Sequence, residues 1–393
     1  MFAWRARRCR TIPQPVCTVS LALFYWLVGF AQLRAGDMYV DDTAEGANDG
    51  TSWASAFVEL QAALDTAEAG TVIRVAAGTY RPSAWPNGGS VEREKHFGLK
   101  NGVTILGGHP DGGGGAQDRD PAVHVATLSG DLDGNAKLDD GNAYHVFYHP
   151  QGTDLDETAV LDGVTITAGS AAGHSDHGSG GGMYNHGCSP TLRNCVFRGN
   201  ADGAMVNTAS HPTLEACSFE ENVGGGMYNS ASNPMLANCR FIRNSDTFAG
   251  GGALDNANSS PILQNCLFEA NSAILAGGIY NQASHPVLTN CRFVGNSASF
   301  SLGGGMYNYV SDPVLTNCTF ESNAGGGLYN SASDPTLTNC TFCGNTADEG
   351  AGLNNASSTP TVTNCIFWAN QAPTDAQIHD NDSVPVITYS CVE

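Results

Sequence analysis

Histidine and aspartate side chains recur at one position of an internal repeat, directly before a proline. His285, Asp312 and Asp334 occupy that position in three successive repeats. If successive repeats stack at about 4.8 Å, the two carboxyl groups lie about 5 Å apart and cannot both ionise cheaply. Such a pair can supply the general acid and the nucleophile of polysaccharide hydrolysis. The alternative is conformational, since turn positions before proline favour small polar residues in any case.

An acidic segment near residue 135 is a candidate metal site. Asp131, Asp133, Asn135 and Asp139 offer oxygen ligands in a pattern similar to the first half of a calcium-binding loop. Ala136 stands where such a loop has its turn glycine, so the alternative is a polar, acidic insertion loop. We therefore expect that no cofactor is required, and that calcium is the ion this loop would bind.

A second group of metal-ligating residues lies in a segment rich in glycine and serine. It consists of His174, Asp176, His177, His186 and Cys188. A zinc site is one interpretation of this group. Two histidines three apart in a loop, however, lack the helical geometry that makes such spacing specific. The pattern therefore favours a flexible loop.

Aromatic residues recur in most repeats, directly after an apolar residue that follows glycines. They are Tyr184, Tyr228, Tyr280, Tyr307 and Tyr329. Stacked in a column, these rings could bind sugar rings, because tyrosine combines an apolar body with a polar tip. The alternative, which the pattern favours, is that the rings pack on each other as pairs between neighbouring repeats.

An eightfold repeat between residues 183 and 370 positions all of these groups. Each repeat has an apolar residue, a cysteine twelve residues later, a phenylalanine two after that, and an asparagine five after the cysteine. The apolar residues are Met183, Met205, Met227, Leu254, Ile279, Met306, Leu328 and Leu353. The cysteines are Cys195, Cys217, Cys239, Cys266, Cys291, Cys318, Cys340 and Cys365. A fixed repeat of about 20–50 residues is typical of a solenoid.

Within each repeat, apolar and polar residues alternate in short runs bounded by glycine, proline and asparagine, which predicts strands rather than helices. Parallel strands joined by crossovers favour the right-handed sense. The predicted fold is therefore all-β: a single-stranded, right-handed parallel β-helix. A short helix between Ser55 and Ala69, with Thr51 or Ser52 as its cap, is expected to cover the N-terminal end.

The repeated columns also have structural roles. Asn185 and its seven equivalents are expected at a turn, with stacked amides that bond from one repeat to the next. Single cysteines one repeat apart suit neither a metal cluster nor close disulfide pairing. We expect most of them to be buried thiols.

Length varies at one point of the repeat, between the last asparagine and the next run of glycines. Insertions at one point of every repeat map to loops on one face, which is often the binding face. The variable loops are 201–204, 245–250, 272–276, 297–303 and 346–350.

The first 36 residues have the features of a secretory signal peptide, because basic residues precede a short apolar stretch. We expect residues 37–182 to form a cap and irregular coils, and residues 183–393 to form regular coils of the same continuous domain. We expect no transmembrane segment in the mature chain, and secretion to the extracellular space, the outer cell surface or the periplasm.

The chain is strongly acidic, with 17 basic and 38 acidic residues and a net charge of −21. Five of the basic residues lie in the first 36, and lysine is absent after Lys137. Long-range repulsion argues against nucleic acid and acidic polysaccharides as partners. A neutral glycan or a cell-surface ligand is compatible with this charge.

The repeat segments GGGMYN (224–229) and NPMLANCRF (233–241) resemble the repeats of the polymorphic outer-membrane protein family. The coil pattern is similar to the wider pectate-lyase-like superfamily of parallel β-helices. Three earlier segments resemble the N-terminal part of bacterial secreted proteins of this kind: residues 39–57, 75–82 and 128–135. This superfamily includes both enzymes and adhesins, so the resemblance implies the fold and leaves the activity open.

Pectate lyases use carboxylate-bound calcium and a basic residue as catalytic base. These repeats contain no lysine, and none of their residues can be matched to the catalytic residues of a pectate lyase. The sequence favours a binding or adhesion scaffold that presents variable loops to a carbohydrate or cell-surface ligand. The alternative is a polysaccharide-active enzyme, either a glycoside hydrolase or a calcium-dependent lyase. A third hypothesis is a purely structural component of the cell envelope.

Overall fold

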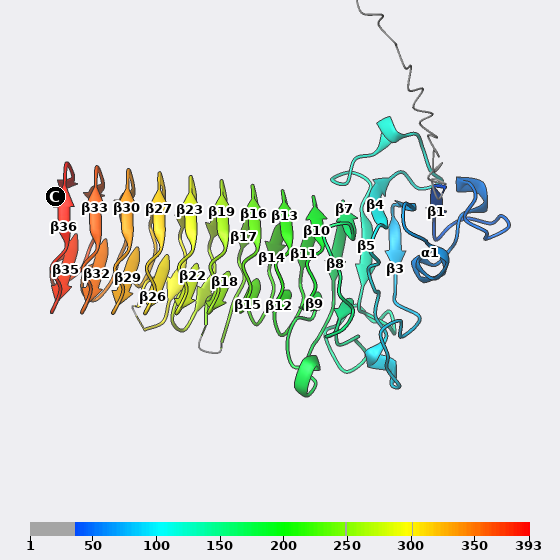
Figure 1. Ribbon diagram of the computed structural model, residues 1–393, viewed down its shortest axis with the longest axis horizontal. Helices are drawn as coiled ribbons and strands as arrows, with labels where there is room; N and C mark the ends of the chain where they lie inside the picture. The colour runs from blue at the N-terminus through cyan, green and yellow to red at the C-terminus, as the bar shows by residue number, and fades with distance from the viewer. Residues whose placement is uncertain (1–35, 248–249, 301) are drawn as a thin grey trace, which may run out of the picture. The chain divides into compact units, whose positions relative to one another are not determined.

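A computed structural model describes residues 36–247, 250–300 and 302–393. These residues follow the predicted architecture, a right-handed parallel β-solenoid in which successive coils stack side by side (Figure 1). Each regular coil contributes one strand to each of three parallel sheets. Equivalent residues pair in register, as Leu192 does with Leu214 and Leu214 with Leu236. The predicted signal peptide lies outside the described residues.

Among the described residues sheet A contains 13 strands, and the middle residue of each strand from Val160–Asp162 to Thr361–Thr363 is buried. The strands are β1 (Met38–Val40), β2 (Val72–Ala76), β4 (Thr104–His109), β7 (Val160–Asp162), β10 (Thr191–Arg193), β13 (Thr213–Glu215), β16 (Met235–Ala237), β19 (Ile262–Gln264), β23 (Val287–Thr289), β27 (Val314–Thr316), β30 (Thr336–Thr338), β33 (Thr361–Thr363) and β36 (Val386–Thr388).

Sheet B contains 12 strands. The strands are β3 (Gly78–Tyr80), β5 (Ala126–Ser129), β8 (Val164–Thr167), β11 (Val196–Arg198), β14 (Ser218–Glu220), β17 (Arg240–Ile242), β20 (Leu267–Glu269), β24 (Arg292–Val294), β28 (Thr319–Glu321), β31 (Thr341–Cys343), β34 (Ile366–Trp368) and β37 (Cys391–Val392). Its inward column is phenylalanine in eight successive coils. The rings of Phe241, Phe268 and Phe293 stack almost parallel, with centroids 5.1 and 4.7 Å apart.

Sheet C contains 10 strands and supplies the third wall of the core. The strands are β6 (Phe147–His149), β9 (Met183–His186), β12 (Met205–Thr208), β15 (Met227–Ser230), β18 (Leu254–Ala257), β22 (Ile279–Gln282), β26 (Met306–Tyr309), β29 (Leu328–Ser331), β32 (Leu353–Ala356) and β35 (Ile378–Asn381). A separate two-stranded sheet, β21 (Ser272–Ala273) and β25 (Ser297–Ala298), lies in two of the variable loops.

The asparagine column that begins at Asn185 lies within the strands of sheet C, so its predicted position at a turn was wrong. Each side chain is buried, and its amide nitrogen donates to the amide oxygen of the next coil, at 2.9 Å from Asn185 to Asn207. The series begins at His149, whose Nδ1 lies 2.8 Å from the Asn185 oxygen, and ends at Asp380, a pure acceptor. All bonds of this ladder therefore point in one direction.

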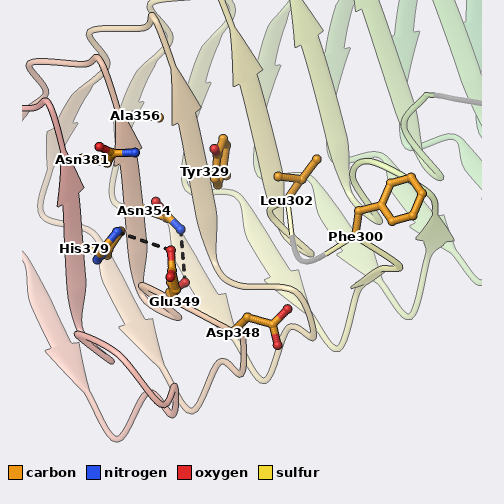
Figure 2. A pocket seen from close by; sticks show the side chains of 9 residues that line it. All are labelled: Phe300, Leu302, Tyr329, Asp348, Glu349, Asn354, Ala356, His379 and Asn381. Carbon is orange, nitrogen blue, oxygen red and sulfur yellow. Dashed lines mark hydrogen bonds and ion pairs between the residues drawn. The ribbon is translucent and has the colours of Figure 1, made fainter.

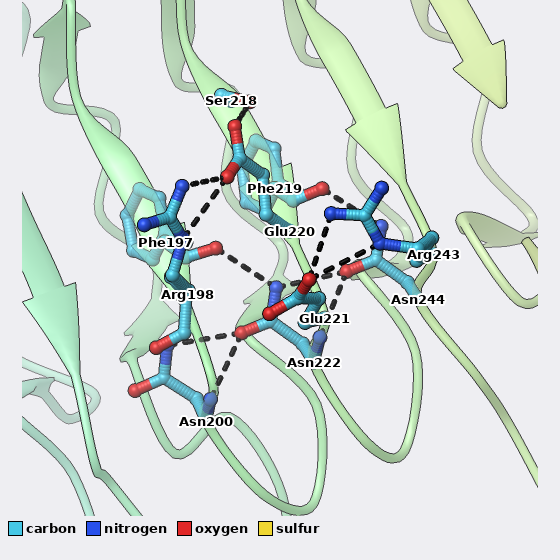
Figure 3. A network of polar contacts seen from close by, with 10 residues as sticks. All are labelled: Phe197, Arg198, Asn200, Ser218, Phe219, Glu220, Glu221, Asn222, Arg243 and Asn244. Atoms are coloured by element: carbon cyan, nitrogen blue, oxygen red, sulfur yellow. Dashed lines mark hydrogen bonds and ion pairs between the residues drawn. The ribbon is translucent and has the colours of Figure 1, made fainter.

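A second buried ladder is formed by the last asparagine of each repeat, at the corner after sheet B (Figure 3). The Nδ2 atom of Asn222 donates to Asn244 Oδ1 (2.8 Å) and to the carbonyl oxygen of Phe197 (2.9 Å). At another corner, the residue before each cysteine has a left-handed backbone, as Asn238 does with a φ of 56°. Tolerance of this conformation explains why asparagine is frequent there.

The cysteine column is buried, as predicted, and all cysteines among the described residues are free thiols. Burial raises the pKa of the Cys217 thiol well above its usual range. The buried column therefore contributes small side chains to the core, and among the described residues it forms no group placed to hold a metal ion.

The N-terminal end is covered by α1 (Leu60–Thr66), which is shorter than the helix predicted from Ser55 to Ala69. Ser52 caps a separate 3₁₀ turn, η1 (Trp53–Ser55), and Phe57 instead pairs with Val40. Three further 3₁₀ turns lie in irregular coils: η2 (Glu92–Glu94), η3 (Ala116–Asp118) and η4 (Ser175–His177). Leu60 and Leu64 of α1 are almost fully buried, so the helix closes this end of the core.

Candidate functional site

The outer face of sheet C carries one continuous column of outward-facing residues, at the second position of each strand. Strand register places each of these side chains next to its equivalent in the neighbouring coil. In order along the stack they are Tyr148, Tyr184, Val206, Tyr228, Asp255, Tyr280, Tyr307, Tyr329, Asn354 and His379. We call this series the tyrosine column.

Tyr280, Tyr307 and Tyr329 form the longest aromatic run of the column. Their ring centroids are 5.3 and 5.2 Å apart. All three rings are partly exposed, whereas Tyr184 is only 6% exposed and packs against Tyr148. In the central run the rings therefore pack on one another, as the pattern favoured, and remain partly exposed.

Asp255 interrupts the tyrosine column between Tyr228 and Tyr280, and it lines a pocket of about 210 Å³. Asp246 and Asp202, from loops before sheet C, also line this Asp255 pocket. The two carboxylates of Asp246 and Asp255 converge over Gly250. The Oδ2 atom of each lies 2.6 Å from the point that a Cβ on Gly250 would occupy. The two oxygens are therefore no more than twice that distance apart.

Burial in this pocket, together with the neighbouring Asp246 charge, raises the pKa of Asp255 to about 7. The backbone N–H of Gly251 acts in the opposite direction, because it favours the ionised form. Burial also raises the pKa of Asp202, against an opposing effect of Arg93. A carboxyl group with a pKa near 7 is half-protonated at neutral pH, so it can give or accept a proton there.

A second pocket, of about 200 Å³, lies on the same face toward the C-terminal end (Figure 2). Tyr329, Asn354 and His379 of the tyrosine column line it, together with Glu349 from a variable loop. The Nε2 atom of His379 lies 3.4 Å from Glu349 Oε2, and its Nδ1 atom lies 3.1 Å from Asp375 Oδ2. This His379 pocket therefore combines an aromatic wall with carboxylate and amide groups.

A cluster of histidines and tyrosines lies at the N-terminal end of the same face. His145 is buried, and its Nδ1–H donates to the carbonyl oxygen of Gly180 at 2.8 Å. Its Nε2 must then accept from Nδ1 of His177, 3.0 Å away, because burial lowers the pKa of His145 to about 3 and keeps it neutral. The Nε2 atom of His177 faces Glu94 Oε1 at 3.9 Å. These contacts fix the loop of η4 beside sheet C.

A family model described as a right-handed β-helix region matches residues 156–311 and 279–390 of this chain. The two matches together cover more than half of the sequence. This protein belongs to the right-handed β-helix family. No curated protein sequence matches it. These matches support the predicted β-helix, whereas they do not show the further likeness to polymorphic outer-membrane proteins.

Several solved structures are similar in fold to this β-helix protein, all at low identity. Pectate lyase Pel9A is 14% identical, with 91% of this chain and 78% of that chain covered and a TM-score of 0.45. A rhamnogalacturonan lyase is 13% identical over 90% and 87%, with a TM-score of 0.37. A surface adhesin of Streptococcus pneumoniae is 11% identical over 85% and 87%, also with a TM-score of 0.37. These likenesses concern the fold alone.

The column before each proline has a structural role in this β-helix protein. Asp312 Oδ1 accepts from the backbone N–H of Asp334 (2.7 Å), and Asp334 Oδ1 accepts from Thr359 in the next coil. His285 Nδ1 accepts from the N–H of Asp312 (3.0 Å). Each side chain therefore caps a backbone donor of the coil that follows. A catalytic role for His285, Asp312 and Asp334 stays a prediction.

The segment proposed to bind calcium closes on itself through hydrogen bonds. Backbone N–H groups of Asn135 and Ala136 donate to the Asp131 carboxylate (3.2 and 3.0 Å), and the Asn135 amide donates to Asp133 and Asp139. In the part of the chain that the structure describes, no three His, Cys, Asp or Glu side chains are placed to hold a metal ion. Calcium binding at this loop stays a prediction.

The five residues considered for zinc are not brought together. Cys188 is buried in the core, and His177 contacts His145 and Glu94 instead. A zinc site formed by His174, Asp176, His177, His186 and Cys188 is therefore not supported.

Sequence reasoning missed Asp246 and Asp255. A signal was present, because Asp255 replaces the tyrosine of its repeat while Asp246 lies in the variable loop just before it. Their separation of nine residues gave no indication that both carboxyl groups lie beside Gly250. In contrast, the spacing identified five tyrosines of the tyrosine column, Tyr184, Tyr228, Tyr280, Tyr307 and Tyr329, but not Tyr148, which precedes them.

Proposed function

We propose that this protein is a secreted carbohydrate-binding scaffold that holds a polymeric glycan along the outer face of sheet C. The observation that carries the proposal is the run of partly exposed rings at Tyr280, Tyr307 and Tyr329. Tyrosine offers a large, stiff apolar face with a polar tip, which suits the apolar faces and hydroxyl edges of sugar rings. Three rings in a row favour an extended ligand over a single sugar.

The two pockets define the ends of the proposed binding face. Asp255 and Asn354 are four coils apart, which corresponds to about 19 Å at about 4.8 Å per coil. A ligand that spans both pockets is therefore an oligosaccharide of several units. Variable loops line both pockets, so a change of loop could alter specificity without a change of the core.

Secretion is part of the proposal and follows from the predicted signal peptide. Within the described ranges, no helix is long and apolar enough to cross a membrane. The charge of the chain, with 38 acidic against 17 basic residues, favours neutral or cationic ligands over acidic polysaccharides. Detection of the protein in the culture medium of its source, with its first residues removed, would test this part.

Glycan binding can be tested with a glycan array followed by calorimetry on the best oligosaccharide. The variant Tyr307→Ala removes the central ring of the run, and we expect about tenfold weaker binding, equivalent to ~1.4 kcal/mol. Trp368→Ala is the control, because it removes an aromatic side chain that is 52% exposed on sheet B. Equal loss in both variants, or no binding to any glycan, would contradict the proposal.

A second candidate function is hydrolysis of the same polymer, favoured by the carboxylate pair of the Asp255 pocket. Asp255, with its pKa near 7, would act as general acid, and Asp246 as nucleophile or base. Release of reducing ends from bound polysaccharide, abolished by Asp255→Asn, is the expected result for an enzyme. Binding without any release over long incubation assigns the protein to the scaffold class.

A further inference from the structure

The outer face of sheet A is uncharged over its C-terminal half. None of the described strands from β16 to β36 contains an acidic residue, a basic residue or a histidine. The outward side chains at the first position of these strands are Met235, Ile262, Val287, Val314, Thr336, Thr361 and Val386. Those at the third position are Ala237, Gln264, Thr289, Thr316, Thr338, Thr363 and Thr388. We call these two columns the neutral face.

The neutral face exposes apolar surface in a regular array. Four successive outward side chains are 41–54% exposed, namely Met235, Ile262, Val287 and Val314. The strands pair residue for residue along the whole face, so equivalent side chains repeat at about 4.8 Å. Contiguous exposed apolar surface on a secreted or soluble protein marks an interaction site.

The charge of the rest of the chain indicates which partner fits this face. Sheet B carries an arginine or a glutamate in each strand from β14 to β28, and the outer face of sheet C has carboxylates in both of its pockets. Two copies of a chain with a net charge of −21 repel each other at long range. The neutral face is where two copies can meet without bringing carboxylates together. We propose that the protein forms a two-fold symmetric dimer through the neutral face.

The shape of the face is self-complementary under one two-fold rotation. If the axis runs along the stack of coils, each strand faces the same strand of the second copy in the opposite direction. The first position then lies opposite the third position of the second copy. The exposed Met235 side chain therefore meets the position of Ala237, where residues of β13, β16 and β19 line a hollow of about 140 Å³.

The flanks of the neutral face favour the same axis. Asp312 and Asp334 precede the strands on one side, and an exposed asparagine series, which includes Asn317 and Asn339, follows the strands on the other side. The rotation along the stack places carboxylates opposite asparagine amides. A two-fold axis parallel to the strands would instead place the aspartates of one copy beside those of the other, which like-charge repulsion disfavours.

The area of the face is sufficient for a reversible dimer. Seven strands at about 4.8 Å each extend about 34 Å along the stack, and five residues such as 313–317 extend about 17 Å across it. Two copies would together bury about 1,200 Å², whereas a specific interface needs about 1,000 Å² or more. We therefore expect a dimer that dissociates on dilution.

The dimer leaves the outer face of sheet C free in both copies, because sheet A is a different wall of the solenoid. A dimer would then present two tyrosine columns, and a long polymer could bind both with increased overall affinity. Dimerisation itself does not depend on the proposed glycan binding, so each can fail without the other.

Sedimentation velocity over a concentration series of the purified protein tests the dimer. Val314→Asp places a charge at the centre of the neutral face, and we expect the dimer dissociation constant to rise at least tenfold. Ile366→Asp is the matched control, because Ile366 is an outward residue on sheet B with similar exposure, and its replacement adds the same charge. Higher salt should strengthen the dimer of the unchanged protein, because it screens the repulsion between two acidic chains.

Disulfide cross-linking tests the two-fold arrangement, in a protein whose Cys343 and Cys391 are both replaced by serine. Met235→Cys and Ala237→Cys are made in separate chains. A mixture of the two variants should form a cross-linked dimer under mild oxidation, whereas each variant alone should cross-link much less. Circular dichroism of all variants checks that they remain folded.

A protein that stays monomeric at every concentration up to about 0.1 mM overturns the inference, and the neutral face is then left for a different protein or a solid surface. A dimer that Val314→Asp does not weaken, or that Ile366→Asp weakens equally, also overturns it, because another face would then hold the copies together. Equal cross-linking of Met235→Cys alone and of the mixture overturns the two-fold axis along the stack. Glycan binding by a strictly monomeric protein would leave the proposed function in place.

Discussion

The buried amide ladder of sheet C makes a sharp prediction for the variant Asn281→Ala. Asn281 is fully buried and stands in the middle of the ladder. Its oxygen accepts from Asn256 Nδ2 at 2.9 Å, and its nitrogen donates to Asn308 Oδ1 at 2.8 Å. Alanine leaves the Asn256 donor and the Asn308 acceptor without these partners, in a core that water does not reach.

The expected loss follows from these two atoms. A buried polar group that loses its partner costs about 1–3 kcal/mol, so two such groups cost about 2–6 kcal/mol. This is a large fraction of the stability of an ordinary domain, about 5–15 kcal/mol. Because a solenoid can unfold one coil at a time, the effect should be concentrated around β18, β22 and β26.

Urea denaturation and amide hydrogen exchange of the three coils together test this expectation. Gln282→Ala is the matched control, because it alters an exposed neighbour in the same strand and should change stability by less than about 0.5 kcal/mol. If Asn281→Ala unfolds at the same urea concentration as Gln282→Ala, with unchanged exchange in β18 and β26, the ladder does not stabilise the fold.

Three further predictions concern the core, its protonation and the Asp255 pocket. Phe268→Ala removes a buried ring between two stacked neighbours and should lower the free energy of unfolding by about 3–5 kcal/mol in a urea titration. Phe300→Ala is the control, because Phe300 is 66% exposed and its loss should have little effect in the same titration. Burial lowers the pKa of His149 from 6.5 to about 4. Between these two pH values the unfolded chain therefore binds a proton that the folded chain does not. The free energy of unfolding should fall by up to about 3 kcal/mol as the pH drops from 6.5 to 4. His149→Gln should flatten that part of the pH–stability curve. Gly250→Ala should abolish ligand binding without unfolding the protein, because the new methyl group would meet the carboxylates of Asp246 and Asp255. Calorimetry measures the loss of binding, and circular dichroism shows whether the variant remains folded.

The periodic part of this fold could be predicted because each column of the repeat has one physical requirement. A position that points into a narrow core must be apolar or fully hydrogen-bonded in every coil, so leucine, phenylalanine and cysteine recur at constant spacing. The left-handed tolerance of asparagine predicts a turn at Asn185, whereas the structure has a strand there. Inside a strand, its ability to donate and accept at once is what the core requires.

The candidate site was harder to predict because it consists of departures from the repeat. Asp255 is informative only as the residue that replaces a tyrosine, and its meaning depends on where the loop before it places Asp246. The carboxylates that did recur at a constant position, Asp312 and Asp334, turned out to accept backbone N–H groups of the next coil. Regular spacing of polar residues in a solenoid therefore indicates scaffold roles first.

The same reasoning explains why the outer face of sheet C is the favoured place for function. Its inward positions are constrained by burial, whereas the outward column can change from Tyr228 to Asp255 to Tyr280 without disturbing the core. Loops that vary in length lie directly beside that column and line both of its pockets. Such a scaffold can acquire a binding or catalytic group by a single substitution, because the neighbouring coils already hold the backbone in place. The Asp255 pocket is the point where this has gone furthest, since three carboxyl side chains line it and burial raises the pKa of Asp255 there.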